Sequence, residues 1–307
     1  MVRAFLVGPT GVGKTEIAVM AAKRLGAEIL GVDSRQIYRR LEIGTAKPTA
    51  AQRRAVRHHL IDLLEPTERC SAGRFIELFR AAMADLRVRG RAGLAVGGAG
   101  LYVDACLGRF HPLPRANPER RRFYASIEER EGPGSLHRRL ARLDPRRAEQ
   151  LAPRDLQRIV RALEVVEATG KRMDEHLQGP PETVCPPTTP VVYLTRARRD
   201  LYARITRRCE AMVDEGLPEE VRTLLASGLD RAAPGFMTLG YTEWAGWALG
   251  EYDRSEAMER FVRNSRRYAK RQDTWFRNRH PDRLELLLAP DETAEAAAKR
   301  VLACIPV

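Results

Sequence analysis

A glycine-rich loop that ends in lysine and threonine is the first stretch of this sequence with residues arranged for chemistry. The loop fits the pattern G-x-x-x-x-G-K-[ST] and consists of Gly8, Pro9, Thr10, Gly11, Val12, Gly13, Lys14 and Thr15. Backbone N–H groups of such a loop converge on phosphate oxygens, and the helix that follows adds its positive dipole end. Lys14 would reach the terminal phosphate, and the Thr15 hydroxyl would hold Mg²⁺. The motif predicts a bound diphosphate or triphosphate and does not distinguish the two.

An aspartate, Asp33, closes the next apolar run, residues 27–32. The carboxyl ends of strands in an open α/β sheet face the ligand crevice, so Asp33 should lie beside the phosphate loop. There it would hold Mg²⁺ through a water molecule, act as the base of a small-molecule kinase, or act as the base for another nucleophile. A simpler role, capping the segment that follows, is compatible with all three.

Short apolar runs alternate with helical patterns in the first hundred residues. Strands are expected at residues 2–7, 27–32 and 94–96, and helices at residues 16–24 and 72–89. Gly26 would end the first of these helices. This alternation predicts an α/β fold with a parallel sheet flanked by helices.

The pattern changes near residue 115, and from there only helices are expected. They run over residues 119–131, 135–143, 145–151 and 155–169. A proline-rich stretch, residues 178–190, closes this region, and residues 191–195 form a return strand. We therefore predict an all-helical insertion domain at 115–185 within a catalytic core made of residues 1–114 and 186–307. Everything after the return strand is predicted to be helical.

Positive charge is concentrated in two short segments of a chain whose formal net charge is +13. Residues 196–208 hold six basic residues and one acid, and residues 260–279 hold eight and one. Such concentration predicts a polyanion as partner. In the second segment Phe261, Tyr268 and Trp275 recur every seven residues, a spacing typical of aromatics that stack on bases or pack against a core.

The cysteines and the apolar runs exclude several classes of protein. The five cysteines include no Cys-x-x-Cys pair, which argues against a zinc site or a disulfide framework and for reduced thiols. No apolar run approaches the roughly 18 residues of a membrane span, and the N-terminus has no signal-peptide features. A cytoplasmic monomer without membrane contact is expected.

Six blocks of the sequence resemble the family of tRNA dimethylallyltransferases, also called tRNA isopentenyltransferases. They are GVDSRQIYRRLEIGTAKPT (31–49), HHLIDLLEP (58–66), VGGAGLY (96–102), LQRIVRALEV (156–165), LGYTEW (239–244) and AKRQDTWFRN (269–278). They occur in the family's order over nearly the whole chain. The paired-cysteine zinc finger of eukaryotic members is absent from the sequence, so the resemblance is to the bacterial type. It implies a P-loop NTPase-like sheet with a helical insertion.

The resemblance also implies an activity and a set of site residues. The family transfers a dimethylallyl group from dimethylallyl diphosphate to the exocyclic N6 amine of the adenosine 3′ of the anticodon. Mg²⁺ on Thr15 is the expected cofactor. Asp33 would be the base, Lys14 and Thr15 would act on the diphosphate, and either Arg204 or Arg208 would bind it. The insertion domain would grip the anticodon stem of the tRNA. The implied tRNA contacts are Asp33, Ser34, Arg35, Gln36, Gly97, Gly98, Ala99, Arg121, Gln157, Arg158, Arg161, Lys270, Arg271, Gln272, Trp275 and Arg277.

The chemistry of the residues agrees with this activity. An adenine amine is a poor nucleophile because its lone pair is delocalised, so a carboxylate that accepts its proton would help the new bond to form. The departing diphosphate needs positive groups around it. The target base is stacked in the anticodon loop and must be flipped into a pocket. One departure from the family is Ala99, where threonine is usual, so any hydroxyl contact from that position is lost.

Three other activities remain open at this stage. A kinase that uses ATP on a metabolite would fit the loop and Asp33 equally well, but not the helical insert and the basic C-terminal segment. An RNA-binding ATPase without transfer activity would leave Asp33 unexplained. A transferase acting on free adenine nucleotides would need neither the insert nor the basic segment.

Overall fold

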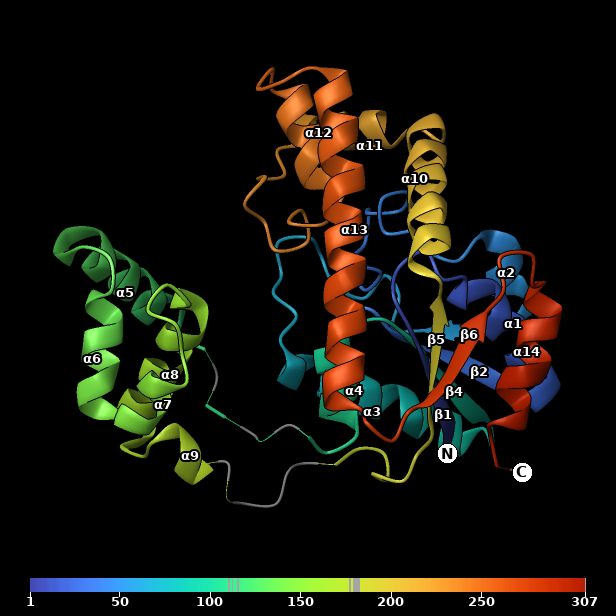
Figure 1. The fold of residues 1–307 in the computed structure, drawn as a ribbon, viewed down its shortest axis with the longest axis horizontal. Helices are drawn as coiled ribbons and strands as arrows, with labels where there is room; N and C mark the ends of the chain where they lie inside the picture. Colours follow the sequence, from blue (N-terminus) through green and yellow to red (C-terminus); the bar gives the residue numbers. More distant parts are fainter. Residues whose placement is uncertain (110, 112, 115, 177, 179–182, 307) are drawn as a thin grey trace. The chain divides into compact units, whose positions relative to one another are not determined.

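The computed structural model describes residues 1–109, 111, 113–114, 116–176, 178 and 183–306. Six parallel strands form one sheet in the order β3-β2-β4-β1-β5-β6 (Figure 1). The strands are β1 (Val2–Val7), β2 (Ala27–Val32), β3 (His58–His59), β4 (Ala92–Gly97), β5 (Val191–Arg196) and β6 (Leu284–Leu288). Every residue of β2 and β5 is buried, as expected for strands covered by helices on both faces of a parallel sheet.

The described residues cluster into two compact units. One consists of residues 1–107 and those from 184 onward, and the other is Gly108–Thr183. The first unit contains the sheet and the helices α1 (Lys14–Leu25), α2 (Ala50–Ala55), α3 (Ala72–Val88), α4 (Gly100–Cys106), α10 (Arg198–Asp214), α11 (Leu217–Ala226), α12 (Tyr241–Ala248), α13 (Arg254–Arg279) and α14 (Ala294–Ala303). The boundary residue expected at 115, and residues 179–182 of the proline-rich stretch, lie outside the described residues.

Strand β1 occupies the centre of the sheet. Phe5 pairs with Ala95 of β4 on one side and with Val191 of β5 on the other. The phosphate loop therefore leaves the sheet between two neighbouring strands, and α1 follows it directly. Gly26 ends α1 at a φ of 58°, which confirms its expected role as helix stop.

Two strands differ from the sequence-based expectation. Residues 284–288 lie in the region after residue 195 that was expected to be helical, yet they form β6. The prediction was wrong because β6 is an edge strand whose stability comes from pairing with β5, for example Leu194 with Leu286. Strand β3 is only two residues long and carries too little pattern to be recognised.

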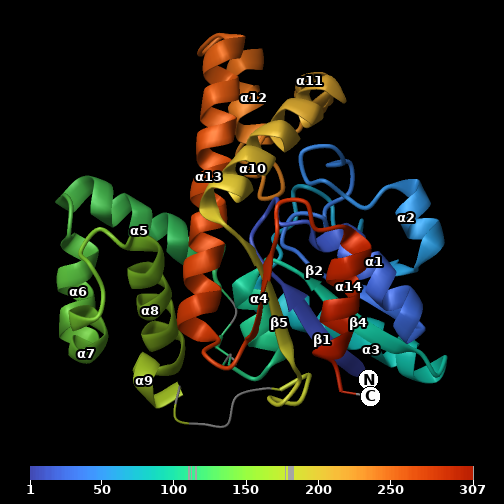
Figure 2. The same ribbon diagram turned by 45° about the vertical axis from the view of Figure 1, so that its right-hand side comes forward.

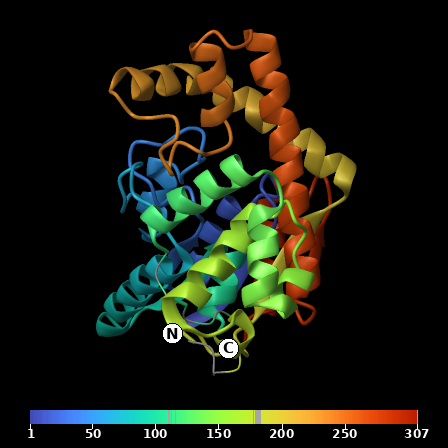
Figure 3. The same ribbon diagram turned by 90° about the vertical axis from the view of Figure 1, so that its left-hand side faces the viewer.

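The C-terminal helices pack against α1 and against one another. Helix α14 lies beside α1, as Figure 2 shows. Helix α13 packs against α10 and, at its N-terminal end, against α12. In Figures 1 and 3, α11 and α12 lie at the end of α13 that is farther from the sheet.

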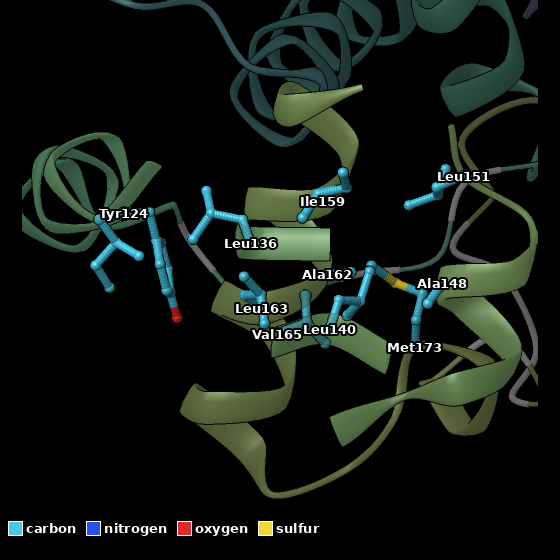
Figure 4. Close-up of a cluster of buried hydrophobic side chains, with 11 residues drawn as sticks. Tyr124, Leu136, Leu140, Ala148, Leu151, Ile159, Ala162, Leu163, Val165 and Met173 are labelled. Atoms are coloured by element: carbon cyan, nitrogen blue, oxygen red, sulfur yellow. The ribbon is translucent and has the colours of Figure 1, made fainter. Parts of the chain in front are cut away.

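The second unit is helical throughout its regular structure. It contains α5 (Pro118–Glu131), α6 (Ser135–Leu143), α7 (Pro145–Glu149), α8 (Leu156–Thr169) and α9 (Met173–His176). Its own apolar core, drawn in Figure 4, joins side chains of all five helices, among them Tyr124, Leu140, Ala148, Leu163 and Met173. Such a core gives the unit a source of stability independent of the sheet.

Two general features complete the description. The five cysteines are free thiols. Of the helices in the described part of the chain, none has both the length and the apolar character required to cross a bilayer.

Candidate functional site

The phosphate loop adopts a conformation that its glycines make possible. Gly11 and Gly13 have φ values of 81° and 106°, in the left-handed region that favours glycine. A Cβ atom on Gly11 would lie 2.8 Å from Cγ1 of Ile205 in α10. The loop therefore wraps closely against α10, with its backbone accessible to a ligand.

Gly97 and Gly98 lie where the carboxyl ends of three neighbouring strands, β2, β4 and β1, approach one another closely. A Cβ atom on Gly97 would lie 1.8 Å from the carbonyl oxygen of Val32, and one on Gly98 would lie 3.1 Å from the carbonyl oxygen of Gly8. The next residue, Ala99, donates its N–H to Val32 at 3.3 Å. The backbones that carry Asp33 and the phosphate loop thus meet at this glycine pair, where a side chain has no space.

Lys14 lies inside this loop with its ammonium group on backbone oxygens. Its Nζ donates to the carbonyl oxygens of Gly8 and Pro9, both 2.9 Å away. Burial, and then the nearby charge of Arg208, lower the pKa of Lys14 to about 7, while Asp33 raises it. An anion with several negative charges would stabilise the charged form of Lys14 and is the ligand that this group favours.

Both candidate arginines of α10 reach the phosphate loop. Arg208 donates to the hydroxyl of Thr10 at 3.0 Å, and Arg204 donates to the carbonyl oxygen of Gly11 at 3.1 Å. Burial lowers the pKa of each guanidinium, and the charge of Arg196 adds to the effect at Arg204. Of the two, Arg208 is the one whose charge acts on Lys14.

Asp33 faces the same cavity with one carboxylate oxygen engaged. Its Oδ1 accepts the N–H groups of Arg35 at 2.8 Å and Gln36 at 3.3 Å, so the capping role is present. No described residue donates a hydrogen bond to Oδ2. The carboxylate can therefore hold its own loop and still accept a proton from a ligand.

These groups line one open cavity of about 970 Å³. The phosphate loop, Asp33 and the two arginines contribute to it, together with α13, which adds Tyr268, Arg271 and Gln272. Burial, and then the negative charge of Asp33, raise the pKa of Tyr268 to about 12. The cavity has a cationic end suited to phosphate and a carboxylate close to it.

The other expected contacts on the sheet unit have varied surroundings. Arg35 donates to the carbonyl oxygen of Pro234 at 2.9 Å, and the amide nitrogen of Gln36 donates to those of Thr45 and Ala46. Ser34 is half-buried, and Lys270 is exposed.

Two expected contacts at the end of α13 are held by neighbours within the sheet unit. Trp275 packs against Gly100, where a Cβ atom would lie 2.2 Å from Cδ1 of the indole ring. Arg277 forms ion pairs with Asp273 and Glu285.

The expected contacts in the helical unit form two groups. Arg121 and Arg161 pair with the buried carboxylate of Glu164 at 2.9 and 3.5 Å, so they help to hold this unit together. Gln157 and Arg158 are exposed on α8 and leave this surface open to a partner.

Sequence reasoning assigned no chemistry to several residues that line the cavity. Lys47 lies in the wall with a side chain only 2% exposed, and its ammonium group pairs with Glu42 and Asp62. In the sequence, its position within the block of residues 31–49 was what could have indicated a role for Lys47. Glu243, in the block LGYTEW, accepts from Gly240 N–H at 2.8 Å and from Asn264 at 2.7 Å, and so fixes α12 to α13.

No metal-binding cluster of protein side chains accompanies the cavity. Within the described ranges, no group of three His, Cys, Asp or Glu side chains is placed to hold a metal ion. The Thr15 hydroxyl and the Asp33 carboxylate are among the side-chain oxygen donors that line the cavity. This donor set suits an ion that takes most of its ligands from phosphate oxygens and water, as Mg²⁺ does.

Known proteins resemble this chain over nearly its whole length. A family model described as IPP transferase matches residues 36–279, and one described as isopentenyl transferase matches residues 1–64. A tRNA dimethylallyltransferase of Anaeromyxobacter dehalogenans is 43% identical over 296 residues, which cover 96% of this chain and 97% of that relative.

Solved structures give the same result for the fold. The full-length tRNA isopentenylpyrophosphate transferase from Bacillus halodurans superposes with a TM-score of 0.69 at 36% identity, covering 98% of this chain and 94% of that one. A eukaryotic dimethylallyltransferase acting on tRNA superposes with a TM-score of 0.82 over 98% and 78% of the two chains. At 22% identity the second likeness concerns the fold alone. The predicted P-loop NTPase-like fold is confirmed.

Proposed function

This chain belongs to the tRNA dimethylallyltransferase family, and we propose that it transfers a dimethylallyl group from dimethylallyl diphosphate to the N6 amine of the adenosine 3′ of the anticodon in tRNA. One observation carries the proposal: the carboxylate of Asp33 and the cations of the phosphate loop line the same cavity. Alkyl transfer to nitrogen needs a base on one side of the reacting carbon and positive groups on the leaving group.

The phosphate loop would bind the diphosphate of the donor. Residues of the loop and the first residues of α1 line the cavity, and Lys14, Arg204 and Arg208 lie at the loop. As the bond between the allylic carbon and oxygen breaks, negative charge grows on the diphosphate. Cations already in place stabilise that charge without reorganisation.

Asp33 would be the base for the adenine amine. The N6 nitrogen forms a bond to the allylic carbon, and its proton passes to the free oxygen Oδ2. The hydrogen bonds from Arg35 and Gln36 to Oδ1 keep the carboxylate oriented during this transfer. The proton leaves later to solvent, and inorganic diphosphate is released.

Mg²⁺ is proposed as cofactor, held by the Thr15 hydroxyl and the diphosphate oxygens. When bound, it would neutralise part of the charge on the leaving group. Thr15, at the start of α1 and next to Lys14, would supply the protein ligand for the ion.

The acceptor is proposed to be the anticodon stem-loop of tRNA. Ser34, Arg35 and Arg271 would contact the loop around the flipped base. The helical unit, expected to span residues 115–185, would grip the anticodon stem, with the exposed side chains of Gln157 and Arg158 as contacts. Its internal ion pairs at Arg121 and Arg161 would keep that surface rigid.

Parallel reactions test this function. Purified protein and Mg²⁺ are incubated with unmodified tRNA and dimethylallyl diphosphate, with AMP and the same donor, and with ATP alone, and the nucleosides are analysed by mass spectrometry. We expect N6-isopentenyladenosine in tRNA only. Modification of AMP alone would remove tRNA as acceptor, and nucleotide turnover without prenylation would favour the kinase or ATPase hypothesis.

A further inference from the structure

The two basic segments of the sequence form two helices that pack against each other, α10 and α13. One face of each helix lines the reaction cavity. Arg208 lies on this face of α10, and Gln272 lies on this face of α13. Their opposite faces line a second groove of about 600 Å³. Cys209 and Ser265 separate the two spaces, with both residues buried and their side-chain sulfur and oxygen atoms 3.7 Å apart. The groove is therefore distinct from the cavity that holds the phosphate loop.

Five basic side chains line this groove. They are Arg198 of α10 and Arg263, Arg266, Arg267 and Lys270 of α13, and we call them the groove cations. The guanidinium carbons of Arg198 and Arg266 lie 5.2 and 5.5 Å from the ring centre of Tyr202, also in the groove. Arg266 donates to Thr206 at 2.7 Å, which fixes one cation at the floor between the helices.

The groove cations lack the partners that other arginines of these helices have. Among the described residues, no carboxylate lies within ion-pair distance of any of the five, although Glu210 and Glu259 also line the groove. By contrast, Arg260 of α13 pairs with Glu256, and Arg277 of the same helix pairs with Asp273. The groove cations repel one another because they carry the same charge, and an anion bound in the groove would relieve that repulsion.

We propose that this groove binds the phosphate backbone of an RNA strand, as a contact for the tRNA substrate separate from the pocket for the reacting adenosine. The proposal rests on the proposed function. Three groove cations, Arg263, Arg267 and Lys270, lie four and three residues apart on one exposed face of α13. They span about 10 Å along the helix, so they match a run of successive phosphates better than a single small anion.

The test is a variant that removes these three charges without touching either the floor of the groove or the reaction cavity. The substitutions are Arg263→Gln, Arg267→Gln and Lys270→Gln. A matched control, Arg3→Gln with Lys23→Gln and Arg87→Gln, removes three charges from exposed positions on β1, α1 and α3. The affinity for tRNA is measured over a range of salt concentrations, and the affinity for inorganic pyrophosphate is measured in parallel.

We expect the groove variant to bind tRNA about tenfold more weakly, with the slope of log K against log salt reduced in magnitude by about 2, near 0.7 for each lost phosphate contact. The control should stay within about twofold of the wild type with an unchanged slope. Pyrophosphate affinity should be unchanged in both, because the groove is separate from the phosphate loop.

Several results would overturn the assignment. Equal tRNA affinities for the groove variant and the control would mean that the groove cations are an ordinary solvated surface. A loss of pyrophosphate affinity in place of tRNA affinity would assign the groove to a small anion. If the wild type prenylates tRNA and the groove variant binds tRNA normally, the assignment of the groove to RNA is wrong, but the proposed function stands. A wild type that does not bind tRNA would refute the groove and the proposed function together.

Discussion

Gln272 in α13 and Gly98 at the end of β4 are in direct contact. The amide nitrogen of Gln272 donates to the carbonyl oxygen of Gly98 at 2.9 Å, and its amide oxygen accepts the N–H of Thr10 at 2.8 Å. A Cβ atom on Gly98 would lie 2.2 Å from that nitrogen. The family resemblance assigns Gln272 to tRNA, yet both ends of its buried amide are used inside the protein. We therefore expect it to be a positioning residue for the phosphate loop.

Replacing Gln272 by methionine should weaken diphosphate binding. Methionine has a similar shape but leaves the Thr10 N–H and the Gly98 carbonyl without partners. We expect pyrophosphate affinity to fall about tenfold and tRNA affinity to stay within about twofold, measured by calorimetry and filter binding. Equal losses for both ligands would point to general damage to the fold.

Replacing Gln272 by glutamate adds a readout that a general packing role would not produce. Only a protonated carboxyl group can both donate to Gly98 and accept from Thr10. Activity of the Gln272→Glu variant relative to wild type should therefore rise as the pH falls from 8 to 6. A flat ratio over this range would contradict the positioning role.

Replacing Asp33 by asparagine should remove the base and keep the fold. The asparagine oxygen can still accept from Arg35 and Gln36, but its amide cannot take the proton of the adenine amine. We expect the single-turnover rate of transfer to fall by roughly 10²- to 10⁴-fold, while pyrophosphate affinity changes little. A rate close to that of the wild type would exclude Asp33 as the base.

Of the two arginines at the phosphate loop, Arg208 should contribute more to diphosphate binding. The charge of Arg208 lowers the pKa of Lys14, so it acts on the ammonium group that would bind the diphosphate, whereas Arg204 contacts the loop at Gly11. We expect Arg208→Gln to weaken pyrophosphate binding by roughly 10- to 100-fold and Arg204→Gln to weaken it less, as titration calorimetry would show. The reverse order would assign the diphosphate contact to Arg204.

Glu28 should make the stability of the sheet depend on pH. Its buried carboxylate accepts from Arg89 at 2.5 and 2.7 Å and contacts His59 at 2.7 Å. The hydrogen bonds from Arg89 lower the pKa of Glu28 to about 2. Because the pKa is lower in the folded state, this stabilisation is complete above the unfolded value, near 4.5, and is lost as the pH falls towards 2.

Urea unfolding of wild type and Glu28→Gln at several pH values measures this effect. The free energies of unfolding of the two proteins should differ by up to about 3 kcal/mol at pH 5.5 to 8. The difference should shrink as the pH falls below 4.5 and should be largely lost near pH 2. Asp291→Asn, at an exposed position, serves as the control and should follow the wild type. A constant difference at all pH values would show that packing, and not charge, accounts for the role of Glu28.

Local patterns in the sequence determined much of this protein. The phosphate loop needs a fixed order of glycines, lysine and threonine, so the motif alone predicted its structure and its kind of ligand. Helices α5, α6 and α8 were predicted within a residue or two, because helical periodicity is a local pattern that can be read over a few turns of sequence. Asp33 was predicted beside the loop because parallel strands end at one edge of the sheet.

Only the tertiary structure decided what depends on contacts between distant residues. β6 is a strand because β5 lies beside it, which its own leucines do not reveal. Gln272 reads as a tRNA contact in its block, but the fold brings it to Thr10, 262 positions away in the chain. The two basic segments likewise show their charge in the sequence, but not which face of each helix meets the diphosphate cavity and which lines the groove. That division is set by the packing of α10 against α13, because side chains from both helices must combine to form each surface.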